Sequence, residues 1–145
     1  MTGAQQVYAE DVAPGYALPD LVKNCSSRQL VMWAGAAPDF YEIHYDAEFA
    51  RAAGLPGLVV HGALKYAFLG QLLADWVAPD GRVVSFRCSY RGLDRPGEDL
   101  RCRGVVRAAS VVAGETRIEL EIWIENTRGE ITTPGDAVVV LPSRR

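Results

Sequence analysis

The sequence has few of the residues that build metal centres and disulfide frameworks. Its 145 residues include only two histidines and three cysteines, and Cys25, Cys88 and Cys102 form no C-x-x-C pair. An odd set without such spacing is typical neither of a disulfide framework nor of a zinc site. We therefore expect no metal and no cofactor, and a reducing, cytoplasmic compartment.

Excess positive charge and uninterrupted apolar runs are also missing. Lysine and arginine total 15 against 18 acidic residues, a net charge of −3, which argues against nucleic acid or an anionic membrane as a partner. The first ten residues contain neither a basic residue nor an apolar run, so we expect no signal peptide. Polar residues at His61, Lys65, Gln71 and Asp75 interrupt the most apolar stretch, Leu58–Val77, which predicts a buried helix and no membrane span.

Apolar residues suitable for a core are abundant, since 49% of the chain is hydrophobic and 23% is charged. No repeat, low-complexity segment or Gly/Ser-rich linker divides the sequence. A chain of this length buries about 70% of its unfolded surface, enough to fold without a metal or disulfide. We therefore expect residues 1–145 to form one domain.

The first half of the chain is predicted to be helical and irregular. Cap residues at both ends mark two short helices, Ser26 to Gly35 and Asp46 to Gly54. A third helix, from about Gly62 to Val77, has apolar residues around most of its circumference, which predicts a helix surrounded by other elements. A row of small side chains along this helix favours close approach by a sheet: Ala63, Ala67, Gly70 and Ala74.

The second half changes to the alternating pattern of half-buried strands. Turn sequences such as Ala113-Gly114 separate these strands, which favours antiparallel pairing. A nearly all-apolar helix and an antiparallel sheet both bury their apolar faces when the sheet curls around the helix, so we expect an α+β fold. The expected strands cover about residues 21–25, 84–90, 100–108, 118–125 and 130–141.

Both histidines flank the segment that leads into the third helix. His44 follows Asp39 in a loop dense in ionisable groups, and His61 directly precedes Gly62. The free amides of a helix start favour an oxygen that gains charge, and a carboxylate–imidazole pair nearby suits proton transfer next to a carbonyl. Simpler interpretations stay open: Asp46 as a helix cap, Glu42 as a surface carboxylate, and His61 as a buried histidine that orders the loop.

Taken in order, three segments resemble the MaoC-like dehydratases, a family that includes the R-specific enoyl-CoA hydratases. These are Tyr8–Gly15, Asp39–Asp46 and Val60–Leu64, and residues 135–142 resemble the family's final strand. The usual motif of the family is Gly-Asp-x-Asn-Pro-x-His, followed downstream by His-Gly-Met. The resemblance implies a hotdog fold, in which a curved antiparallel sheet wraps a long helix, and two such domains that pair with active sites at their interface.

Carried over by position, the resemblance implies Asp39 and His44 as the catalytic pair and the Gly62 amide as the donor to a thioester carbonyl. The chain departs from the family's pattern at Pro38, Tyr41, Glu42 and Ala63, where the family has Gly, Asn, Pro and Met. We retain three candidate supporting residues near the pair: Tyr41, Glu42 and His61.

The implied activity is interconversion of a 2-enoyl thioester and a 3-hydroxyacyl thioester, carried by coenzyme A or by acyl carrier protein. Three alternatives stay open: a hotdog thioesterase, a cyclase or isomerase that uses the same proton transfers, and a structural subunit that pairs with another hotdog chain. An exposed sheet edge and an incomplete channel lead us to expect at least a dimer, either a homodimer or a heterodimer.

Overall fold

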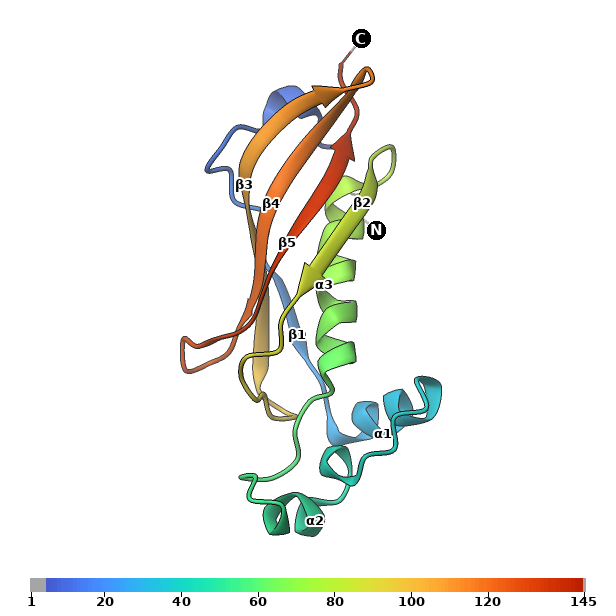
Figure 1. The fold of residues 1–145 in the computed structure, drawn as a ribbon, viewed down its shortest axis with the longest axis vertical. Helices are drawn as coiled ribbons and strands as arrows, with labels where there is room; N and C mark the ends of the chain where they lie inside the picture. The colour runs from blue at the N-terminus through green and yellow to red at the C-terminus, as the bar shows by residue number, and fades with distance from the viewer. Residues whose placement is uncertain (1–4, 145) are drawn as a thin grey trace.

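The computed structural model describes residues 5–144, and Figure 1 shows a curved sheet with a long helix, α3 (Gly62–Val77), along one side. A helical segment lies beyond the end at which α3 begins. It consists of α1 (Ser27–Ala36), the 3-10 turn η2 (Glu42–His44) and α2 (Ala47–Ala52), and another 3-10 turn, η1 (Ala9–Asp11), precedes it in the chain. The loop of ionisable residues therefore lies beside the first turn of α3.

Five strands form one antiparallel sheet in the order β1-β3-β4-β5-β2. Two residues with positive φ, Ala113 (52°) and Gly114 (80°), join β3 to β4, as a tight hairpin with the twist of its strands requires. The strands are β1 (Leu21–Asn24), β2 (Arg82–Cys88), β3 (Asp99–Val112), β4 (Glu115–Glu125) and β5 (Ile131–Leu141). The short β1 and the longer β2 are the two edges.

The core lies between the sheet and one face of α3. The buried residues of α3 recur three and four positions apart, as one face of a helix requires, and include Leu64, Phe68, Leu69, Leu72, Leu73 and Trp76. Alternate side chains of β3 and β4 meet them from the sheet, among them Leu100, Cys102, Ile118, Ile122 and Ile124. Among residues 5–144, no helix has the length and apolar character needed to cross a bilayer.

The prediction that α3 is surrounded on most sides was wrong for the isolated chain. The sheet covers one face only, and Tyr66 on the opposite face keeps 38% of its surface exposed. Ala63 and Ala74 from the row of small residues are exposed, while Gly70 packs against the ring of Phe86. The small residues therefore meet the side chain of an edge strand and solvent, because five strands do not reach around the helix.

The predicted alternation of buried and exposed side chains also fails at two positions, where bulges interrupt the strands. In β2 the register shifts between Val83 and Ser85, so Val83 is half-buried and the predicted inward residue Val84 is exposed. In β3 the register shifts between Val106 and Ala108, and the strand continues to Val112, beyond its predicted end. A bulge inserts one residue and exchanges the two faces, which a period of two does not reveal.

Candidate active site

His44 is held by a hydrogen bond that determines its tautomer. The residue ends η2, is buried, and its Nδ1 atom lies 2.7 Å from the carbonyl oxygen of Val59. A carbonyl oxygen only accepts, so Nδ1 donates its proton to Val59. In the neutral ring, Nε2 is therefore the nitrogen with a free lone pair, available to accept a proton from a reacting group.

Asp39 faces that free nitrogen. One carboxylate oxygen, Oδ2, lies 3.9 Å from His44 Nε2, and the Asp39 side chain remains 43% exposed. This separation exceeds a direct hydrogen bond and leaves a position from which one water molecule can donate to both atoms. The Asp39 amide donates to the carbonyl of Ala34 in the last turn of α1 (3.0 Å), which anchors the loop to that helix.

His61 joins the loop to the start of α3. Its fully buried ring stacks on His44 with centroids 3.7 Å apart and planes inclined by 19°, and Nε2 lies 3.4 Å from the backbone oxygen of Asp39. Burial lowers the pKa of His61, and the adjacent His44 lowers it further, which favours the neutral ring. The predicted residues Asp39, His44 and His61 are thus brought together from two segments of the chain.

The same three side chains have the composition of a metal site, with one ligand atom from each lying within 4.8 Å of the others. A zinc ion lies close to the plane of each imidazole it binds, about 2.0–2.1 Å from the nitrogen. Two nearly parallel rings 3.7 Å apart do not share such a point. In this arrangement the two histidines do not fit one ion.

Gly62 is the first residue of α3, directly after His61. Its amide has no backbone acceptor in the described part of the chain, and the side chain of His61 does not cap the helix. A methyl group on the Gly62 α-carbon would lie 2.8 Å from two ring atoms of Tyr90, so glycine is needed for this close approach. A free donor at the positive end of a helix therefore lies one residue beyond the histidine stack.

The three other candidate residues of the loop, Tyr41, Glu42 and Asp46, differ in their surroundings. Tyr41 contacts His44 edge-on, with centroids 6.4 Å apart, and packs in the same way on Phe49 of α2. Glu42 is exposed, and its carboxylate makes no hydrogen bond within residues 5–144. The simpler interpretation of Asp46 is confirmed, because it caps α2 by accepting the amides of Glu48 and Phe49 at 3.0 Å.

Sequence reasoning missed a buried polar cluster next to Gly62. Lys65 of α3 forms an ion pair with Asp94, and Thr132 of β5 donates to the same carboxylate. The available signal was a lysine on the apolar face of a helix, where only a paired charge is stable. Its partner lies 29 residues away, and no local pattern indicates it.

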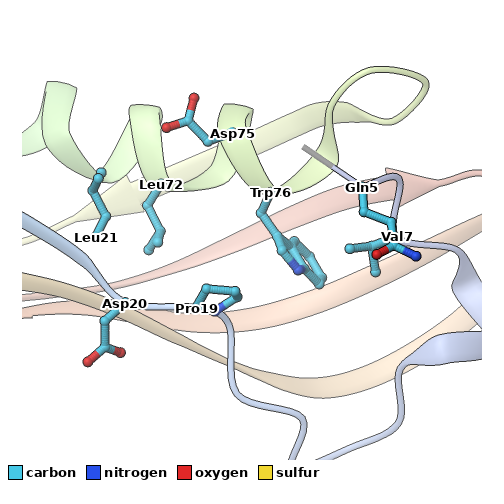
Figure 2. A pocket seen from close by; sticks show the side chains of 8 residues that line it. All are labelled: Gln5, Val7, Pro19, Asp20, Leu21, Leu72, Asp75 and Trp76. Carbon is cyan, nitrogen blue, oxygen red and sulfur yellow. The ribbon is translucent and has the colours of Figure 1, made fainter. Parts of the chain in front are cut away.

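An apolar pocket of about 330 Å³ lies along the second half of α3. Figure 2 shows Leu72 and Trp76 projecting from α3 into it, with Pro19 across from them and Val7 at the end near Trp76, while the carboxylates of Asp20 and Asp75 point away. Leu72 is ten residues after Gly62, or about 15 Å along the helix. This pocket is therefore separate from the histidine cluster.

Residues 14–128 match the MaoC-like domain family, and the chain therefore belongs to it. Two fungal relatives support this assignment. The fatty acid synthase subunit beta of Aspergillus oryzae is 30% identical over 111 residues, 74% of this chain and 5% of its own length. The fatty acid synthase beta subunit TOXC of Cochliobolus carbonum is 29% identical over 117 residues, 79% of this chain and 6% of its own length. The chain spans only a small part of either relative.

Solved structures confirm the α+β hotdog fold. R-hydratase PhaJ1 from Pseudomonas aeruginosa superposes with a TM-score of 0.85 at 18% identity, covering 96% of this chain and 88% of the other. The (R)-hydratase from A. caviae involved in PHA biosynthesis has a TM-score of 0.81 at 22% identity, covering 92% of this chain and 100% of the other. A chain of the ChsH1–ChsH2 complex from Mycobacterium tuberculosis has a TM-score of 0.77 at 22% identity, covering 89% of this chain and 98% of the other.

Proposed function

We propose that this chain interconverts a 2-enoyl thioester and a 3-hydroxyacyl thioester, with Asp39 and His44 as the acid–base pair. The observation that carries the proposal is the tautomer of His44, whose free Nε2 lies 3.9 Å from the Asp39 carboxylate. Membership of the MaoC-like family supports this reaction type, as do the hydratase names of the structural relatives.

In the hydration direction, one water molecule donates hydrogen bonds to Asp39 Oδ2 and His44 Nε2. Both atoms are acceptors, so the oxygen of this water directs a lone pair at C3 of the enoyl group. His44 Nε2 takes one proton as the C3–O bond forms, and the electrons of the double bond move onto the thioester oxygen. The dyad then returns a proton to C2, which completes the addition of water.

The Gly62 amide is the proposed donor to that thioester oxygen. It is unpaired within the described chain and stands at the start of a sixteen-residue helix, where its N–H and the helix dipole both favour developing negative charge. His61 keeps the two parts together, because its ring stacks on His44 while its backbone continues into Gly62.

Two substitutions test the acid–base pair. Asp39→Asn keeps the shape of the side chain and removes its charge, and His44→Ala removes the base. Each is expected to lower kcat by about 10²–10⁴-fold, the usual contribution of a positioned acid–base group. The measurement is loss of enoyl absorbance in a screen of enoyl thioesters of varied length and bulk, on coenzyme A and on acyl carrier protein.

The control is Glu48→Gln, which changes a nearby exposed carboxylate to an amide and is expected to leave kcat within about twofold. Wild-type turnover by both Asp39→Asn and His44→Ala contradicts the assignment of the pair. Release of free thiol without loss of the enoyl group indicates a thioesterase instead. A wild-type chain that is inactive alone and active only with a second hotdog chain indicates a partner subunit.

A further inference from the structure

A buried ion pair next to the proposed thioester donor has no part in the mechanism above. Lys65 lies in the first turn of α3, three residues after Gly62, and its Nζ is 3.0 Å from Asp94 Oδ2. The two side chains are 3% and 0% exposed. Burying such a pair is often no better for stability than apolar residues of the same volume, so stability alone does not explain it.

The pair holds the segment Tyr90–Asp94, called here the clamp segment, between α3 and the sheet. Lys65 Nζ also donates to the carbonyl of Gly92 at 3.0 Å, and Thr132 of β5 donates to Asp94 Oδ2 at 2.6 Å. The amides of Arg91 and Gly92 in turn donate to the Thr132 carbonyl, at 2.9 and 3.1 Å. The clamp segment is therefore fixed by charge-assisted and backbone bonds on both sides.

Both ends of the clamp segment meet the residues that lead into Gly62. The Asp94 carbonyl accepts the amide of Val60 at 2.8 Å, and the Tyr90 ring lies against Gly62. The preceding residue, Val59, accepts the hydrogen bond from His44. A continuous series of contacts thus joins Lys65 and Asp94 to the donor amide and to the acid–base pair.

We propose that the Lys65–Asp94 pair is a positioning device that fixes the Gly62 amide relative to His44. The effect of this pair on catalysis rests on the proposed function, whereas its effect on the position of the segment does not. Directional bonds hold a backbone segment in one place, whereas apolar packing allows small shifts, and a misplacement of about 1 Å can cost about 100-fold in rate. A donor held in place before the reaction also needs no reorganisation during it.

The test is the double variant Lys65→Met/Asp94→Asn, which removes both charges, keeps the side-chain volumes and leaves no buried charge unpaired. We expect kcat to fall by about tenfold or more with KM changed by less than about threefold, because an oxygen that is charged only in the transition state loses its aligned donor. Amide hydrogen exchange at Val60 is expected to become about tenfold faster or more, while exchange at Ile122 in the sheet stays unchanged.

The matched control is Arg107→Met/Glu121→Gln, which removes an ion pair that is exposed on the interior strands β3 and β4. It is expected to change neither kcat nor exchange at Val60. Unchanged exchange at Val60 in the Lys65/Asp94 variant overturns the proposal, and so does faster exchange with wild-type kcat. If the wild-type chain hydrates no thioester, the proposed function fails, and the exchange rate alone then decides whether the pair positions this segment.

Discussion

At the scale of single residues, burial gives His61 a measurable signature. Because burial lowers its pKa, the folded chain binds a proton at His61 less readily than the unfolded chain does. As the pH falls below about 6.5, the ordinary value, the unfolded chain gains this proton first, and the free energy of unfolding decreases. We expect the urea midpoint to fall between pH 7.5 and pH 5.5, and to fall less in His61→Gln.

The same pH range excludes Glu115 and Glu130 as the cause. Arg82 beside Glu115, and Asn126 with Arg128 beside Glu130, lower the pKa values of those carboxyls from 4.5, so the stability they contribute is lost only at more acidic pH. Glu130→Gln is therefore a control that should keep the wild-type change between pH 7.5 and 5.5. An identical change in His61→Gln and the wild type contradicts the prediction.

At the scale of elements, the first turn of α3 combines a free amide with a close aromatic neighbour. In Gly62→Ala the new methyl group meets the Tyr90 ring, which is 56% exposed, so a shift of this side chain toward solvent can accommodate the methyl group. The fold should therefore persist. Because alanine keeps the N–H, kcat is expected to fall only as far as the clash shifts this amide, by less than the about 10²–10³-fold that removal of an oxyanion donor costs. Enoyl hydration kinetics and thermal unfolding measure the two effects separately.

A second substitution tests whether the clash with Tyr90 displaces the Gly62 amide. Tyr90→Ser removes the ring and is expected to reduce activity only slightly by itself. Gly62→Ala/Tyr90→Ser keeps the amide and removes the clash, so it is expected to recover most of the lost kcat. A double variant as slow as Gly62→Ala contradicts displacement of the amide by the Tyr90 clash as the cause.

The link between α3 and the clamp segment also has a consequence for stability. Lys65→Met leaves Asp94 buried and without its counter-charge, which is expected to lower the free energy of unfolding by about 3–5 kcal/mol. Addition of Asp94→Asn should recover most of this loss, since no charge then remains buried. Denaturant unfolding of the single and double variants measures both values, and equal stability of the two contradicts the argument.

At the scale of the whole molecule, the β2 edge of the sheet and the outer face of α3 are exposed within residues 5–144. β2 is a sheet edge, and beside it the outer face of α3 exposes Tyr66, which stacks on Phe86 of β2 with centroids 4.3 Å apart. An unpaired edge next to exposed apolar side chains favours association with a second hotdog domain. We expect at least a dimer in light scattering at micromolar concentration.

A charge placed on this surface should weaken the dimer. Tyr66→Glu is expected to raise the dissociation constant by about tenfold or more, because a carboxylate at an apolar interface loses its water. Val111→Glu, at an exposed position near the β3–β4 turn, is the control and should leave the dimer unchanged. A wild-type chain that stays monomeric and fully active contradicts this prediction.

The sequence by itself determined the features that depend on neighbouring residues. Cap residues and periodicity predicted the helices and the strands to within a few residues, and the order of Asp39, His44 and Gly62 indicated the candidate site. Only the tertiary structure decided the stacking of His61 on His44, the proton position on His44 and the pairing of Lys65 with Asp94. These features join residues 15 to 29 positions apart, and no local pattern encodes them because they form only when folding brings separate segments together.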